Sequence, residues 1–260
     1  MRDLGAILRS GRRTLGTWNQ IAAPEIIDLI GWNGFDYAVI DCEHGPFGIE
    51  AAERQGRACR AAGLAPAVRV PSDDRVAIMK ALDAGLDHVV VPNMVGGAMA
   101  ARAVAATRYA PDGTRGACPC VRATGHHTTD WPAHVRRTAA TTGIIPLVET
   151  AEGMATLHEI VATEGLTAVM VGPFDLAVSL GLEGNWRDGR VQEALTAAVT
   201  TAADADVPII MPLFAPDADE CAARLEAWSA LGVTNFMIGS DKILLAHTLG
   251  HWTTRLRPSA

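Results

Sequence analysis

Short apolar runs rich in β-branched residues alternate along the chain with longer, alanine-rich stretches of mixed polarity. Continuous apolar runs of roughly four to eight residues indicate strands that are buried on both faces, as in a parallel sheet. Eight such strands are predicted. They cover Leu15–Trp18, Tyr37–Asp41, Ala67–Val70, His88–Val91, Ile144–Glu149, Ala168–Val171, Val207–Met211 and Asn235–Ile238.

Helical patterns fall between these strands. They cover Pro24–Trp32, Glu50–Ala62, Asp73–Ala84, Ala98–Thr107, Trp131–Thr141, Ala151–Thr163, Arg190–Ala205 and Pro216–Ala230, with a closing helix from Asp241. A unit of strand and helix that repeats eight times is the signature of the (β/α)8 TIM barrel, an α/β fold that needs about 250 residues. The chain has 260 residues and no linker that would divide it, so residues 1–260 are predicted to form a single barrel domain.

The composition narrows the range of partners. The formal charge of −7 argues against a nucleic-acid surface, and no run reaches the roughly 18 consecutive apolar residues of a membrane span. The stretch Met1–Arg13 lacks a secretory signal pattern, and five cysteines at unrelated spacings favour reduced thiols. Gly96 and Gly97 lack the spacing of a dinucleotide fingerprint. We therefore expect a cytoplasmic protein without a nucleotide cofactor.

Polar residues follow several predicted strands, at the end of a barrel where active sites lie. Glu149 and Asp175 end two successive strand units, so their carboxylates are predicted to share one rim. Two carboxylates with open positions suit Mg²⁺ or Mn²⁺. Acids at strand-to-helix turns also occur as N-caps or first-turn residues of helices, and the spacing alone favours neither interpretation.

Two further rim residues carry candidate chemistry. His44 lies beside Asp41 and Glu43, which makes it a candidate general base, although a structural histidine that bonds a loop carbonyl fits equally well. Arg69 closes an otherwise apolar strand, where it is suited to bind a carboxylate or enolate, to pair with a rim acid, or to do both. The sequence leaves these alternatives open.

The chain contains only two lysines, Lys80 and Lys242, and neither falls in a predicted strand. An enzyme that forms a Schiff base needs a buried lysine that points into the barrel mouth. Covalent imine chemistry is therefore not expected.

The connection between the fourth and fifth strands breaks the regular rhythm of the chain. Its loop, Tyr109–Asp130, contains Gly, Pro, Cys and His residues. Long loops in compact domains tend to be functional, so we expect this segment to form a lid or a wall of a site.

A set of short motifs extends over nearly the whole chain. They are Gly16-Thr17-Trp18, Gly34-Phe35-Asp36-Tyr37, Ile40-Asp41-Cys42-Glu43-His44, Val68-Arg69-Val70-Pro71, Leu82-Asp83-Ala84-Gly85, Val89-Val90-Val91-Pro92, Arg108-Tyr109, Gly113-Thr114-Arg115-Gly116, Glu149-Thr150 and Gly172-Pro173-Phe174-Asp175-Leu176. With these motifs the sequence resembles the HpcH/HpaI-type class II aldolases, metal-dependent enzymes that act on pyruvate.

The resemblance implies a role for each matching position. Glu149 and Asp175 match the ligands of a divalent metal, which is expected to be Mg²⁺, Mn²⁺ or Co²⁺. His44 matches the catalytic base, Asp83 the acid that pairs with it, and Arg69 the cation that stabilises the pyruvate enolate. The implied substrate-binding residues are Trp18, Leu147, Gly172, Pro173 and Phe174. Family members assemble as hexamers that often exchange the C-terminal helix, so a homohexamer built as a trimer of dimers is expected.

The implied reaction is the reversible aldol cleavage of a 4-hydroxy-2-oxo acid to pyruvate, or a related 2-oxo acid, and an aldehyde. Two alternatives remain, a decarboxylase or other lyase of oxaloacetate-like acids and a non-catalytic ligand-binding barrel in which Phe174 plugs the site. The sequence departs from the family at Leu147, where some close relatives carry glutamine, at Phe174, where many carry a smaller residue, and in the loop 117–131, where the second substrate is expected. These departures concern the choice of substrate.

Overall fold

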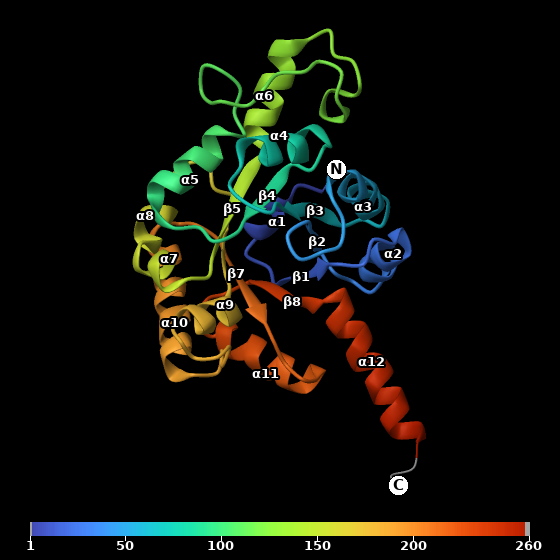
Figure 1. The fold of residues 1–260 in the computed structure, drawn as a ribbon, viewed down its shortest axis with the longest axis vertical. Coiled ribbons are helices and arrows are strands. Elements are labelled where there is room, and N and C mark those ends of the chain that lie inside the picture. Colours follow the sequence, from blue (N-terminus) through green and yellow to red (C-terminus); the bar gives the residue numbers. More distant parts are fainter. Residues whose placement is uncertain (1, 258–260) are drawn as a thin grey trace.

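Eight parallel strands close into one barrel in the order β1 to β8, and β8 pairs with β1 (Figure 1). A computed structural model describes residues 2–257. The strands are β1 Thr14–Asn19, β2 Tyr37–Asp41, β3 Ala65–Arg69, β4 His88–Val91, β5 Gly143–Val148, β6 Val169–Val171, β7 Ile209–Leu213 and β8 Asn235–Ser240. The predicted single-domain (β/α)8 TIM barrel is confirmed.

Apolar side chains fill the barrel from inside and cover it from outside. Successive residues of a strand point to opposite faces, so Tyr37 and Val39 of β2 lie in the cluster inside the barrel, whereas Ala38 and Ile40 lie in the cluster under the helices. The short helix α1 (Leu4–Leu8) contributes both of its leucines to the inner cluster and closes the N-terminal end of the barrel. Burial on both faces explains the continuous apolar runs of the sequence.

The helices surround the strands, as predicted. They are α2 Pro24–Trp32, α3 Ile49–Ala61, α4 Arg75–Asp83, α5 Gly96–Ala105, α6 Trp131–Thr141, α7 Ala151–Ala155, α8 Leu157–Val161, α9 Pro173–Ser179, α10 Gly189–Asp204, α11 Ala218–Ser229 and α12 Asp241–Leu256, with a 3-10 turn at Arg122–Thr124. Most bounds differ from the prediction by one or two residues, as in β7, which starts two residues later, and no helix was predicted over α1 or α9.

The predicted helix Ala151–Thr163 is broken into α7 and α8 at Thr156. The Thr156 hydroxyl donates to the carbonyl oxygen of Glu152 at 3.0 Å and accepts from the backbone N–H of Gly96 at 3.0 Å. This residue therefore ties the chain to the start of α5, a long-range contact that helical periodicity does not reveal.

The loop 109–130 contacts both ends of α4, since the carbonyl oxygen of Thr114 accepts a hydrogen bond of 3.0 Å from the side chain of Arg75, the first residue of that helix. It packs along α4, where Arg115 pairs with Asp83 at 2.7 Å. Its Arg122 lines a pocket together with His88, the first residue of β4, so the loop extends to the N-terminal end of the strands. Within the described chain the loop therefore forms a wall of this pocket, because α5 has already returned the chain to the N-terminal end before the loop begins.

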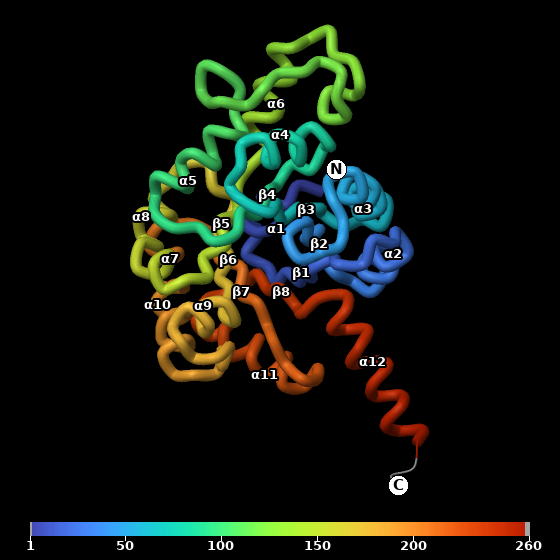
Figure 2. Tube along the Cα trace, viewed as in Figure 1, coloured from blue at the N-terminus to red at the C-terminus, as the bar shows by residue number. Residues whose placement is uncertain are grey.

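The last helix, α12, projects away from the barrel (Figures 1 and 2). Four of its apolar side chains are between 43% and 71% exposed. They are Leu245, Leu249, Trp252 and Leu256. An apolar stripe of this kind lacks a partner within the described part of the chain. Neither α12 nor any other helix in the described range is long and apolar enough to cross a membrane.

Candidate active site

The C-terminal ends of the strands surround a cavity of about 210 Å³. Nine of the ten residues that the sequence analysis placed in the site line this cavity. They are Trp18, His44, Arg69, Leu147, Glu149, Gly172, Pro173, Phe174 and Asp175. The structure thus brings together residues that are separated by more than half of the chain.

Glu149 directly follows β5 and is only 4% exposed. Its Oε1 accepts a hydrogen bond of 2.9 Å from the backbone N–H of Asn93. Burial and the neighbouring charge of Asp175 together raise the pKa of Glu149 to about 7, against the opposing effect of the Asn93 hydrogen bond. A bound cation would offset both causes of this shift, because it stabilises the ionised carboxylate.

The backbone after β6 approaches Glu149 closely at Gly172. A Cβ atom at this position would lie 2.5 Å from Cβ and 2.7 Å from Oε2 of Glu149, so the observed arrangement requires glycine. The helix α9 begins at the next residue, Pro173, and carries Asp175 in its first turn. This turn brings the second carboxylate close to the first.

The two acids suit a hard divalent cation. Glu149 is not a helix cap, because the Thr150 side chain caps α7, whereas Asp175 is a first-turn acid of α9. Within residues 2–257, no group of three or more His, Cys, Asp or Glu side chains is arranged to hold a metal. A cation held here would have these two carboxylates as protein ligands and water and substrate as its other ligands, as is common for Mg²⁺.

Arg69 ends β3 and is held by Asp41, which ends β2. The two residues are partners in the β2–β3 register, and Nε and Nη2 of Arg69 donate hydrogen bonds of 2.9 and 2.7 Å to the Asp41 carboxylate. Nη1 lies 3.1 Å from Oε2 of Glu43, and the guanidinium lies 4.2 Å from the centre of the Trp18 ring. Since a guanidinium has five N–H groups, Arg69 can pair with these acids and still donate to an anion in the cavity.

His44 lies at the mouth of the cavity, and its side chain is 64% exposed. Its Nε2 is 4.0 Å from Oε2 of Glu43, and its backbone N–H donates to Oδ1 of Asp41 at 3.1 Å. The same aspartate thus positions both the loop that carries His44 and the guanidinium of Arg69. An imidazole that faces both the cavity and solvent can exchange protons with each, as a general base must.

The tenth predicted site residue, Asp83, lies outside this cavity. It is the last residue of α4, and its Oδ1 accepts a hydrogen bond of 2.7 Å from Arg115, whose side chain is fully buried. Helices of a barrel run antiparallel to its strands, so this end of α4 faces away from the catalytic rim. Within the described part of one chain, Asp83 and His44 do not pair.

Phe174 borders the cavity without filling it. Its ring lies against Gly184, where a Cβ atom would approach the ring to 2.7 Å, and the residue is 52% exposed. Leu147 presents an apolar side chain from β5 and is 2% exposed. The cavity therefore remains open beside both residues, which weakens the interpretation of a plugged barrel.

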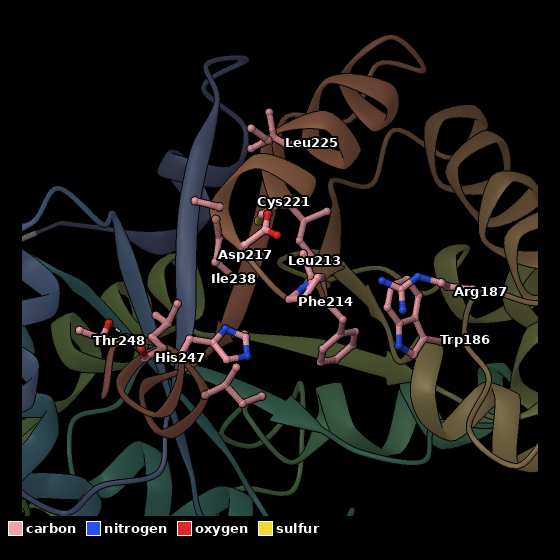
Figure 3. Close-up of a pocket in the computed structure, with 17 residues that line it drawn as sticks. Trp186, Arg187, Leu213, Phe214, Asp217, Cys221, Leu225, Ile238, His247 and Thr248 are labelled. Carbon is pink, nitrogen blue, oxygen red and sulfur yellow. Dashed lines mark hydrogen bonds between the residues drawn. The ribbon is translucent and has the colours of Figure 1, made fainter. Parts of the chain in front are cut away.

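A larger groove of about 810 Å³ adjoins this cavity (Figure 3). The two share Phe214, Gly239 and Ile243 as lining residues. In Figure 3, Trp186 and His247 of α12 lie on opposite sides of this groove. The ring centre of Trp186 is 6.1 Å from that of Phe214. The cavity thus opens into a space that can take the second part of a longer substrate.

Sequence reasoning missed three groups that shape the site. In the sequence, Asp41 stands out only as an acidic neighbour of His44, and its place at the end of the strand beside that of Arg69 is the signal for their pairing. Gln20 donates to Oδ2 of Asp41 at 2.8 Å, and the Asn93 backbone binds Glu149. Neither of these two carried a signal, because their types and spacing do not distinguish them from other loop residues.

Comparison with known proteins agrees with this geometry. The family model described as HpcH/HpaI aldolase/citrate lyase matches residues 14–246. The chain is 34% identical over 238 residues to 5-keto-4-deoxy-D-glucarate aldolase of Salmonella paratyphi A, a match that covers 91% of this chain and 89% of the relative.

Solved structures are similar over the whole barrel. An HpcH/HpaI aldolase/citrate lyase family protein from Burkholderia cenocepacia J2315 is 29% identical with a TM-score of 0.89, and the match covers 98% of this chain and 99% of that one. The citrate synthase SbnG is 26% identical with a TM-score of 0.85, and the match covers 97% and 96% of the two chains.

Proposed function

This chain belongs to the HpcH/HpaI aldolase/citrate lyase family, and we propose that it cleaves a 4-hydroxy-2-oxo acid reversibly to pyruvate, or a related 2-oxo acid, and an aldehyde. The chain is a carbon–carbon lyase. The observation that carries the proposed reaction is the grouping of two carboxylates, Glu149 and Asp175, with Arg69 around one cavity at the catalytic rim.

Glu149 and Asp175 would hold the metal, with Mg²⁺, Mn²⁺ and Co²⁺ as the candidates. When bound, such a cation stabilises negative charge that develops on the 2-oxo acid. The backbone N–H groups at the start of α9, after Gly172, are suited to bind the carboxylate of that acid, because they lack partners within the helix.

His44 would remove the proton of the 4-hydroxyl group as the bond between C3 and C4 breaks. The electrons of that bond form the enolate of pyruvate, and Arg69 donates hydrogen bonds to its oxygen. Protonation of the enolate carbon then completes the cleavage. Trp18 would keep the guanidinium in place through the stacking contact at 4.2 Å.

Exchange of the pyruvate methyl protons for deuterium in heavy water tests the enolate without the unknown aldehyde. Proton NMR should detect exchange that requires a divalent metal and that Arg69→Ala suppresses. The test includes 2-oxobutanoate and oxaloacetate, because Leu147 and Phe174 alter the ketoacid pocket. If none of the three acids exchanges or loses carbon dioxide with any of the three metals, the binding-barrel alternative is favoured.

The runner-up function is decarboxylation, or another lyase reaction, of oxaloacetate-like acids on the same enolate. The inclusion of citrate lyases in the family and the similarity to a citrate synthase support this alternative. Product analysis separates the two, since one reaction releases an aldehyde and the other carbon dioxide. A 5-keto-4-deoxy-glucarate should be among the aldol substrates tested, because the relatives that act on it are 34% identical.

Imine chemistry is not part of the proposal. Lys80 lies in α4 and Lys242 at the start of α12, and neither is among the residues that line the cavity. Borohydride with pyruvate should therefore trap no adduct that mass spectrometry detects, and Lys80→Ala should retain turnover. A trapped adduct would require a different mechanism.

We infer that the active form is a homohexamer in which α12 is exchanged and Asp83 of one chain pairs with His44 of another. The exposed stripe of α12 and the distance of Asp83 from the cavity of its own chain support this arrangement. Co-expression of Glu149→Ala and Asp83→Ala chains tests it. Mixed hexamers should be more active than either variant alone, because some sites then contain both residues. Activity no higher than that of the variants would contradict pairing between chains.

We propose that the protein is cytoplasmic. All five cysteines are unpaired in the structure. Reduced thiols are typical of a reducing compartment.

A further inference from the structure

A separate cavity of about 490 Å³ lies at the N-terminal end of the barrel, between the start of β4 and the loop before α6. Its charged lining consists of four arginines and two aspartates, together with two histidines. They are Arg2, Arg60, Arg122, Arg137, Asp3, Asp87, His88 and His126. Arginine therefore predominates here, although the whole chain carries a formal charge of −7.

Both aspartates of this cavity already have a partner. Oδ2 of Asp87 lies 2.9 Å from Nη2 of Arg60. Oδ1 of Asp3 lies 3.1 Å from Nε2 of His88, which is 5% exposed. Neither carboxylate is thus left to neutralise the other arginines.

Arg122 and Arg137 form no ion pair with any described carboxylate. Arg137 donates from Nη2 to the carbonyl oxygen of Ala123 at 3.1 Å and lies 2.8 Å from Nδ1 of His134. The side chain of Arg122 packs over Gly85, where a Cβ atom would lie 3.4 Å from its Nε. Packing rather than charge pairing therefore positions the Arg122 guanidinium at the cavity.

We propose that this cavity binds a small oxyanion with two or more negative charges, a phosphate or a dicarboxylate. The planar guanidinium group matches both kinds of anion through paired N–H donors. The volume is within the usual range of small-molecule sites. The cavity shares no lining residue with the catalytic cavity, so this inference does not depend on the proposed function.

Isothermal titration of the full-length, chelator-treated protein tests the site with inorganic phosphate and, separately, with succinate at constant ionic strength. Saturable binding of at least one of the two is expected, and the comparison tells which class the site prefers. Arg122→Ala should weaken the affinity about tenfold or more, because it removes a charged partner. The double variant Arg122→Ala/Arg137→Ala should abolish binding. Arg122→Lys, which retains the charge but not the paired donors, should fall between these.

Two controls keep the result specific. Arg136→Ala removes one positive charge from α6, the helix that carries Arg137, at a position that does not line the cavity, so this variant should bind the anion as the wild type does. Arg69→Ala should also bind normally, which separates this site from the catalytic cavity. Circular dichroism and the thermal midpoint establish that each variant is folded. Absence of saturable binding to both anions, wild-type affinity in the double variant, or loss of binding in Arg69→Ala would overturn the proposal.

Discussion

Replacing Gly172 with alanine tests whether catalysis depends on the observed position of Glu149. Gly172 has φ −114° and ψ 88°, values that alanine adopts without difficulty, so the substitution adds a contact rather than backbone strain. The added Cβ would lie 2.5 Å from Cβ of Glu149, whereas ordinary contacts begin at 3.4 Å. Glu149 or the backbone of Gly172 must therefore move by about 0.9 Å.

A shift of this size is large compared with the tolerance of a metal site, in which ligand distances stay within about 0.2 Å of their usual values. Because Glu149 is one of only two proposed protein ligands, we expect the dissociation constant for Mn²⁺ to rise about 100-fold, equivalent to about 2.7 kcal/mol. Titration calorimetry measures the affinity, and deuterium exchange into pyruvate measures the consequence for the enolate. The crowding itself should lower the free energy of unfolding by about 1–3 kcal/mol.

Gly189→Ala is the matched control. Gly189 is the first residue of α10, and no atom lies within 4 Å of an added Cβ. This variant should bind Mn²⁺ and exchange deuterium as the wild type does. Wild-type metal affinity and exchange in Gly172→Ala would refute the reasoning that Glu149 must stay where the structure places it.

Three further predictions follow from the site. Chelator should abolish deuterium exchange, Mg²⁺, Mn²⁺ or Co²⁺ should restore it, and Asp175→Asn should prevent the restoration; full activity in chelator would exclude the metal. His44→Ala should lower kcat about 10²-fold without changing the thermal midpoint, because the side chain is 64% exposed, and unchanged kcat would remove it from the mechanism. Asp41→Asn should cost about 3 kcal/mol at pH 7, since it removes the carboxylate that binds two nitrogens of the buried Arg69 and leaves only the contact with Glu43. Burial acts to raise the pKa of Asp41, but the hydrogen bonds from Arg69 lower it overall, so its stabilising effect is complete above about pH 4 and is lost as the pH falls through the lower value of the folded state. Denaturant titrations should accordingly show a steeper loss of stability below about pH 4 for the wild type than for the variant, and equal slopes would contradict this assignment.

Local patterns were sufficient to predict most of the fold. The bounds of β2, β4, α2 and α6 agree with the sequence prediction, because each strand is a continuous apolar run and each helix has a clear start signal. The break at Thr156 could not be predicted in this way, since it depends on a hydrogen bond to Gly96, about sixty residues away along the chain. The direction of the loop 109–130 likewise depends on the packing of α4 and α5.

The rim of the site was predictable because parallel strands of a barrel all end on the same side. A residue at the end of a strand, or within four residues after it, therefore reaches the site whatever its distance in sequence, and this holds for His44, Arg69, Glu149 and Asp175. This rule does not apply to Asp83, because that residue ends a helix and not a strand. Only the resemblance to the family connected it with His44, and a resemblance between chains does not tell which chain of an assembly supplies a residue.

Three features of the chain support the proposed hexamer. The apolar stripe of α12 is exposed, the adjoining groove of about 810 Å³ is open, and Asp83 lies away from the cavity in which its proposed partner stands. A soluble monomer rarely exposes an apolar stripe of this length beside an open groove. Assembly would cover the stripe, and it would also allow the acid at the N-terminal side of one barrel to meet the histidine at the catalytic rim of another. The proposed pairing of Asp83 with His44 and the covering of α12 would then both depend on the hexamer. Truncation within α12 should therefore abolish the hexamer and, with it, the contribution of Asp83 to kcat.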